Sequence, residues 1–296
     1  MYNISALPGP AGAIIYRFPL YLGSIRIWES LYALPFAYTG MVLAAGGWPG
    51  WGTFTWITVA MAGARTLGMS ANRLIHHKED IANPRTANRH LPRGLLKPWE
   101  VLMMMAVSTG VFFYAASQIN SLALALAPVA AAYVVLYSYA KYVTWSCHFL
   151  LGWALGISPS AAWIAVTGRM DPEAALLSFA VAMWAGGFDV VYGCADYDFD
   201  RGYGVNSVPS RFGISAALWV TKGMHLLAAS ALLALGFWLH LSFFYFIGWA
   251  IAVALLTFEN ILLKADNLSK LQSPLFKYNS TISVVLLLFT ILAVAT

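Results

Sequence analysis

Charged side chains are scarce in this sequence. Only 10% of its 296 residues are Asp, Glu, Lys or Arg, whereas 60% are hydrophobic. A soluble globular domain carries roughly 25% charged residues. So few charges cannot cover the surface of a soluble protein of this length, which excludes the soluble enzymes and binding modules. Together with a mean hydropathy of +0.70, the shortage of charge indicates an integral membrane protein.

Cysteine is also nearly absent. The two cysteines, Cys147 and Cys194, lie in or beside apolar runs, far apart in the sequence. They form neither a disulfide framework nor the spacing of a metal site, so neither class of protein is indicated. We interpret both as small apolar packing residues.

Long apolar runs recur along the whole chain. A membrane-crossing helix needs about 20 apolar residues. Nine runs approach or exceed this length, at residues 25–46, 52–76, 98–117, 121–140, 145–167, 173–193, 214–237, 240–263 and 275–295. The sequence therefore predicts an all-α polytopic membrane protein of about nine transmembrane helices.

The basic residues follow every second run. They gather in residues 78–97, at Lys141, in residues 201–211 and in residues 264–277. The connections around Gly47, Gln118 and His240 have none, and the connection after the fifth run has only Arg169. Cytoplasmic loops are the ones enriched in Lys and Arg. This alternation predicts a cytoplasmic N-terminus, and it accounts for the formal charge of +5 without a nucleic-acid partner.

Two polar stretches stand out at the ends of the second and sixth runs. In the first, Asn72, His76 and Asp80 follow one another at a spacing of four residues, and in the second, residues 189–200 carry several aspartates at similar spacing. Residues four apart lie on one face of a helix. Polar groups where a helix leaves the bilayer are costly to bury and usually mark a site. Both stretches are predicted on the cytoplasmic side, facing each other.

Carboxylates together with arginines suggest a metal and phosphate site. Oxygen ligands from a few carboxylates suit Mg²⁺, which commonly bridges to substrate phosphates. Guanidinium groups bind phosphate oxygens in a bidentate way. The candidate phosphate donors are Arg73, Lys78, Arg85, Arg89, Arg93 and Arg211. Two alternatives stay open: the charges pair with one another or lie in water, and Arg89 or Arg93 binds anionic lipid headgroups.

The motifs resemble a known family. N-R-L-I from Asn72, D-I-A-N-P-R-T-A-N-R from Asp80, Y-S-Y-A-K from Tyr137 and G-F-D-V-V-Y from Gly187 are similar, in this order, to the motifs of the UbiA superfamily of intramembrane aromatic prenyltransferases. The stretch C-H-F-L-L-G-W-A-L-G from Cys147 looks most like the menaquinone branch, often labelled 4-hydroxybenzoate polyprenyltransferase.

The resemblance implies a fold and an activity. The fold would be a single domain over residues 1–296, with nine helices around a central cavity, in a bacterial or archaeal cell membrane with the active site cytoplasmic. The activity would be Mg²⁺-dependent transfer of a polyprenyl group from its diphosphate to an aromatic acid. The acceptor would be 1,4-dihydroxy-6-naphthoate or, close behind, 4-hydroxybenzoate, and the tail would reach the membrane lipid.

The resemblance also assigns roles to residues. Metal binding falls to Asp80, Asp196 and Asp200. Orientation of the reacting groups falls to Asp189, Tyr192 and Lys141, which we expect to be catalytic. Diphosphate binding falls to Asn72, His76, Arg65, Arg73, Arg85, Arg89, Tyr137 and Arg211. For Arg65, pairing with Glu29 or Asp189 within the bundle is an equal alternative. His148 is expected to pack in the bundle or to face the aromatic acid.

His76 departs from the family pattern, which has Asp at this position. Imidazole prefers softer ions than Mg²⁺. Three interpretations stay open: the ring binds diphosphate as a cation, it binds a metal-bound water, or the protein is altered in activity. Tyr142, where many relatives carry Arg, removes one phosphate-facing charge. The rival functions are a non-catalytic isoprenoid-diphosphate or quinone carrier and a tetrapyrrole prenyltransferase, which would need a wider pocket beside Asp189.

Overall fold

The computed structural model describes residues 10–263 and 268–296, without side chains for residues 10–16, 268–274 and 276. Helices dominate it, and the described residues contain no strand. The longer helices are α1 (Pro10–Ser24), α2 (Ser30–Ala45), α3 (Trp51–Ile75), α5 (Pro98–Ile119), α6 (Ser121–Leu136), α8 (Cys147–Thr167), α9 (Pro172–Cys194), α12 (Ile214–Trp238), α13 (Phe243–Leu262) and α14 (Leu268–Ala295). Short helices join them: α4 (His77–Ala82), α7 (Ala140–Val143), α10 (Tyr197–Tyr203) and α11 (Val208–Phe212). The all-α prediction is confirmed.

Seven helical segments of the described chain are long and apolar enough to cross a membrane. They coincide with the last seven of the nine expected runs. The first two runs are also helical, as α2 and α3. However, α2 has only 16 residues, and α3 carries Arg65, Asn72 and Arg73 within its 25 residues. The count of nine spans therefore stays a prediction, as does the single domain over residues 1–296.

Helix α9 lies at the centre of the bundle. In its most apolar window 78% of the residues are buried, against 17% in α5. Small residues allow its neighbour α8 to approach closely: a Cβ on Gly152 would overlap the carbonyl oxygen of Ala182, and one on Gly156 would lie 2.7 Å from that of Ser178. Small residues four apart are the usual means of close helix packing in membranes. This contact fixes the position of the polar C-terminal end of α9.

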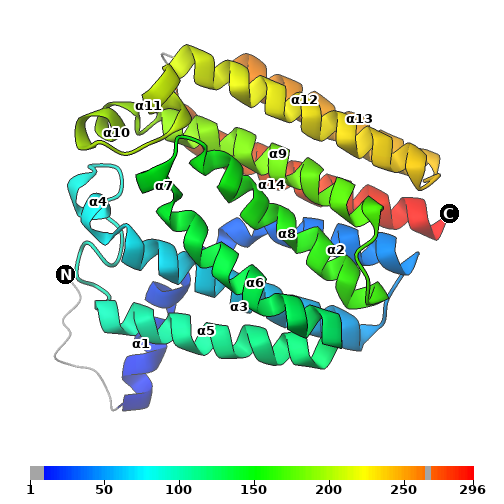
Figure 1. Cartoon of the computed structure of the whole chain (residues 1–296), viewed down its shortest axis with the longest axis horizontal. Helices are drawn as coiled ribbons and strands as arrows, with labels where there is room; N and C mark the ends of the chain where they lie inside the picture. Colours follow the sequence, from blue (N-terminus) through cyan, green and yellow to red (C-terminus); the bar gives the residue numbers. More distant parts are fainter. Residues whose placement is uncertain (1–9, 264–267) are drawn as a thin grey trace.

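The polar connections gather at one end of the bundle. Figure 1 shows α4, α7, α10 and α11 at this end, while the C-terminus lies at the opposite end. The short helices α4 and α10 directly follow the two polar stretches of the sequence. The prediction that the two stretches lie on the same side of the bundle is therefore confirmed. Residues 264–267, part of the last basic connection, lie outside the described chain.

Candidate active site

Each polar stretch contains a break between a long helix and a short one. Helix α3 ends at Ile75, and His76 adopts a non-helical conformation before α4 begins. Likewise α9 ends at Cys194, and Asp196 is the N-cap of α10. The helix expected through Asn72, His76 and Asp80 is thus interrupted at His76, although the backbone N–H groups of His76 and Asp80 still donate to the carbonyl oxygens four residues earlier. Each break turns the chain across the end of the bundle.

One cavity of about 240 Å³ lies between these two breaks. Thirteen of the fourteen candidate residues line it: Arg65, Asn72, Arg73, His76, Asp80, Arg85, Arg89, Tyr137, Lys141, Asp189, Tyr192, Asp196 and Asp200. The exception is Arg211, which is exposed on α11 and does not line the cavity. Tertiary folding thus brings together residues that are more than 100 positions apart in the sequence.

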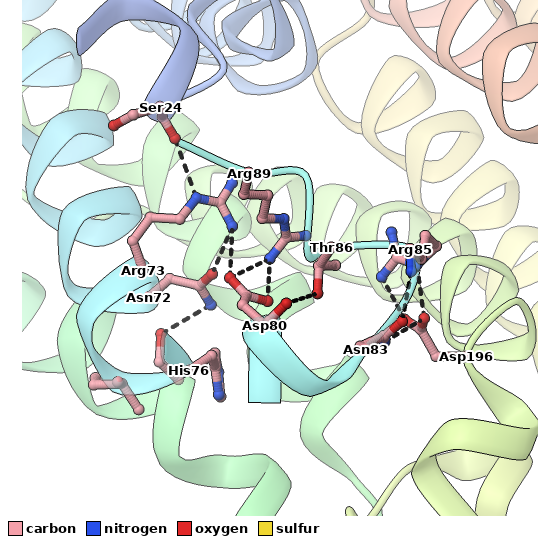
Figure 2. Close-up of polar contacts among 12 residues, drawn as sticks. Ser24, Asn72, Arg73, His76, Asp80, Asn83, Arg85, Thr86, Arg89 and Asp196 are labelled. Carbon is pink, nitrogen blue, oxygen red and sulfur yellow. Dashed lines mark hydrogen bonds and ion pairs between the residues drawn. The ribbon is translucent and has the colours of Figure 1, made fainter. Parts of the chain in front are cut away.

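Arginines of the connection after α4 bind the carboxylates around the cavity (Figure 2). Nη1 of Arg89 donates to both oxygens of Asp80, at 2.6 and 2.8 Å. Arg73 lies 3.9 Å from the same carboxylate and donates to the Ser24 carbonyl oxygen at 3.1 Å. Asp80 is thus held by arginines that lie within ten residues of it in the sequence.

Asp196 connects the two polar stretches. Arg85 donates to both of its carboxylate oxygens, and Asn83 Nδ2 donates to Oδ1 at 2.9 Å. Burial by itself would raise the pKa of Asp196, but the hydrogen bonds and charge of Arg85 outweigh it and keep the pKa below its ordinary value. Asp196 is therefore ionised at neutral pH. Asn83 was not among the site residues expected from the sequence.

Asp200 is a buried carboxylate without an ion pair in the described part of the chain. Burial raises its pKa, and the positive charge of Lys141 and a hydrogen bond with Ser207 only partly oppose this. A carboxylate that lacks compensation in a buried place favours a nearby cation. Asp200 is thus a candidate ligand for a cation in the cavity.

His76 lies in the turn after α3, and its side chain is buried. Nδ1 is 3.1 Å from the hydroxyl of Tyr142. Burial and the neighbouring ammonium of Lys141 lower the pKa of His76 to about 4. The ring is therefore neutral at pH 7 in this structure, which removes support from the interpretation that it binds diphosphate as a cation.

Arg65 is paired with Glu29, the first of the partners considered in the sequence analysis. Nη2 lies 3.1 Å from Glu29 Oε2 and donates to the Arg26 carbonyl oxygen at 3.1 Å. Its side chain still borders the cavity. We therefore interpret Arg65 as a residue that joins α3 to the chain before α2 and supplies positive charge at the deep side of the cavity.

The deep side of the cavity contains Asp189 and Tyr192, one helical turn apart on α9. Tyr192 shares a hydrogen bond with Tyr32 of α2, with 3.2 Å between the hydroxyl oxygens. Asp189 Oδ2 lies 2.6 Å from Nδ1 of His148. His148 does not line the cavity, so its expected contact with the aromatic acid is not found, and the packing alternative is closer to the structure.

An apolar groove of about 550 Å³ continues from the cavity between α3, α6 and α8. Four residues line both spaces: Arg65, Met69, Tyr137 and Leu155. The groove extends to Ile119 and Ala123, at the junction of α5 and α6 on the opposite side of the bundle. A charged cavity that opens into an apolar groove suits a ligand with an anionic head and a lipid tail.

The carboxylates fit a hard cation in their chemistry, because Asp80, Asp196 and Asp200 offer only oxygen donors. In the described residues, no three His, Cys, Asp or Glu side chains are gathered closely enough to hold a metal ion. Asp80 and Asp196 are bonded to Arg89 and Arg85. A cation would therefore compete with these arginines for two carboxylates and find the third, Asp200, free of an ion pair in the described chain.

The chain is a helical membrane protein with a charged cavity and an apolar groove, the features of an enzyme for amphiphilic substrates. Its residues 33–281 match the UbiA prenyltransferase family. The chain belongs to the UbiA prenyltransferase family, and the protein is a prenyltransferase. The resemblance recognised from the motifs is thereby confirmed, and a non-catalytic carrier is not supported.

Similar proteins support this assignment. The chain is 31% identical over 244 residues to a 4-hydroxybenzoate octaprenyltransferase of Aliivibrio fischeri, covering 82% of this chain and 83% of the relative. A UbiA homologue of Aeropyrum pernix K1, solved in its apo form, has a TM-score of 0.82 at 27% identity, covering 90% of this chain and 98% of that one. A homologue of Archaeoglobus fulgidus, solved bound to GPP and Mg²⁺, has a TM-score of 0.65 at 16% identity, with 94% and 100% covered.

Proposed function

We propose that the protein transfers a polyprenyl group from its diphosphate to an aromatic carboxylic acid. The observation that carries the proposal is the continuity between the charged cavity and the apolar groove, which share Arg65, Met69, Tyr137 and Leu155. The diphosphate would lie in the cavity and the isoprenoid tail in the groove. The name of the Aliivibrio fischeri relative supports an aromatic acid as the acceptor.

The residues around the cavity would have different roles in the reaction. Arg73, Arg85, Arg89 and Lys141 would hold the diphosphate and stabilise the negative charge that grows as it leaves. Asn72 and Tyr137 line the same space and are suited to orient it through hydrogen bonds. Fixed charges in a site with little water perform this task well, because they need no reorganisation during the reaction.

Mg²⁺ would be held by Asp80, Asp196 and Asp200, and when bound it would neutralise diphosphate charge. The proposal draws support from the burial of Asp200, which Lys141 and Ser207 compensate only in part, and from the Archaeoglobus fulgidus homologue solved with GPP and Mg²⁺. Arg85 and Arg89 are bonded to two of these aspartates. We propose that the guanidinium groups of Arg85 and Arg89 exchange their hydrogen bonds with the carboxylates for hydrogen bonds with the diphosphate when the substrate and its cation bind.

The acceptor would lie at the deep side, beside Asp189 and Tyr192. Ionisation of an allylic diphosphate creates a cation that must be kept from water. Tyr32, Phe188 and Tyr192 border the cavity here, and aromatic faces stabilise cations. A cavity of about 240 Å³ favours a one- or two-ring acid over a tetrapyrrole. The positive-inside rule further supports a cytoplasmic position for this end of the bundle, which carries the basic connections.

Prenyl transfer by the purified protein in lipid tests the proposal. The assay would use geranylgeranyl diphosphate, Mg²⁺, and 4-hydroxybenzoate in competition with 1,4-dihydroxy-6-naphthoate. We expect a prenylated acid whose formation stops on addition of EDTA and resumes with Mg²⁺, and the preferred acid identifies the acceptor. Absence of product from both acids, despite measurable binding of the diphosphate, would contradict the proposal.

Replacement of His76 by aspartate is expected to preserve or raise turnover. The new carboxylate would restore the family pattern beside Asp80 and replace a neutral ring, so the Mg²⁺ concentration for half-maximal activity should fall, by roughly tenfold for one added ligand charge. A Mg²⁺ titration of activity measures this. His77→Asp is the matched control, because His77 does not line the cavity. An inactive His76→Asp beside an active His77→Asp would mean that the imidazole itself has a specific role.

A further inference from the structure

Asp189 is bound from outside the cavity by a histidine of the neighbouring helix. His148 is the second residue of α8, and its Nδ1 lies 2.6 Å from Asp189 Oδ2. The His148 side chain is only 3% exposed, whereas that of Asp189 is 21% exposed and borders the cavity. His148 therefore does not border the cavity, but it contacts a carboxylate that does.

The helix packing leaves room for the ring of His148. Gly193 lies one turn beyond Asp189 on α9, and a Cβ there would stand 2.7 Å from Cε1 and 3.0 Å from Nε2 of His148. Nε2 is buried and has no hydrogen-bond partner in the described part of the chain. The bond to Asp189 is thus the contact that orients the ring. A carboxylate has only acceptor atoms, so Nδ1–H donates to Oδ2.

We propose that His148 is a positioning residue for prenyl transfer: it fixes Asp189 so that the other carboxylate oxygen, Oδ1, takes the proton released by the acceptor ring. This inference rests on the proposed function and names the base for its last step. A π electron pair of the aromatic acid forms the new bond to the prenyl carbon. The bond between this carbon and the diphosphate oxygen breaks, and the diphosphate leaves with the electron pair of that broken bond. The electron pair of the C–H bond at the alkylated carbon then restores the aromatic ring, and the proton goes to Oδ1 of Asp189.

An aspartate side chain at the edge of a cavity can rotate, which makes it a less efficient base. Without a hydrogen-bond partner, the carboxylate of Asp189 rotates about its side-chain bonds, and only a small fraction of its conformers places an oxygen next to the ring carbon that loses the proton. One fixed oxygen makes the other a directed base, and a misplacement of about 1 Å costs on the order of 100-fold in rate. The groups proposed to hold the diphosphate lie on α3, on α7 and on the connection after α4, so we expect donor binding to be independent of the contact between His148 and Asp189.

The test compares His148→Leu with His148→Asn. The asparagine amide can replace Nδ1–H as the donor to Asp189, whereas leucine fills the space without a donor. We expect His148→Leu to lower kcat by about 100-fold with the KM for the prenyl diphosphate unchanged, and His148→Asn to recover most of the loss. With an acceptor deuterated at the alkylated position, the kinetic isotope effect should be larger in the leucine variant than in the wild type, because proton removal becomes rate-limiting.

Each other result would overturn the positioning role. A leucine variant with wild-type kcat would do so, and so would an isotope effect equal to that of the wild type. Equal losses in both variants, together with weaker donor binding and a lower Tm, would show that the ring serves packing. Wild-type protein in the same assay separates the two proposals: its failure to prenylate any acid would overturn the proposed function itself, and this inference with it.

Discussion

Asp200→Asn is expected to reduce turnover by at least about 1,000-fold, equivalent to about 4 kcal/mol of transition-state stabilisation. Asp200 is buried at the cavity and makes no ion pair in the described residues. The substitution would remove a full negative charge from the place where we expect a cation and change the shape of the side chain little. Prenyl transfer at saturating Mg²⁺ and diphosphate measures the effect.

The same substitution should leave the protein folded. Burial raises the pKa of Asp200, so the carboxylate costs stability in the absence of a cation, and a neutral amide avoids this cost. We therefore expect an equal or higher Tm. The matched control is Asp198→Asn, because Asp198 lies on the same short helix α10 but is exposed and does not line the cavity. Turnover of Asp200→Asn within tenfold of that of Asp198→Asn would contradict the metal-binding role.

Ala130→Trp is expected to abolish transfer of long prenyl chains while sparing short ones. Ala130 lines the apolar groove on α6, seven residues before Tyr137, where groove and cavity meet. Seven residues of helix correspond to about 10 Å. An indole at this point would leave space for a short tail near the cavity and block the remainder of the groove. We expect a loss of roughly 100-fold or more for long donors, which is the scale of misplaced reacting atoms.

Competition between geranyl diphosphate and an octaprenyl donor measures this change in preference. Ala132→Trp provides the control, because Ala132 lies two residues further on the same helix, is exposed, and does not line the groove. Unchanged use of the long donor by Ala130→Trp would show that the tail leaves the cavity by another route, which would remove the groove from the proposed function.

The sequence by itself determined the class of protein and most of the residues around the cavity. Apolar length decides where a helix can cross a membrane. Within the part of the chain that the structure describes, seven helices meet this condition, and they coincide with seven of the expected runs. The polar motifs were recognisable because buried charge is costly and is kept only where it serves a site. The family was recognised from these motifs and confirmed over residues 33–281.

Only the tertiary structure decided which groups are partners. Helical spacing predicted a continuous face through His76, but the chain turns there and starts a new helix. The pairing of Arg85 with Asp196 joins residues 111 positions apart, and the contact of His148 with Asp189 depends on how closely α8 packs on α9. Periodicity along one helix carries no information on the neighbour that it meets. That choice depends on how closely the helices approach, which the missing side chains of Gly152 and Gly193 allow and which becomes apparent only when the helices are packed.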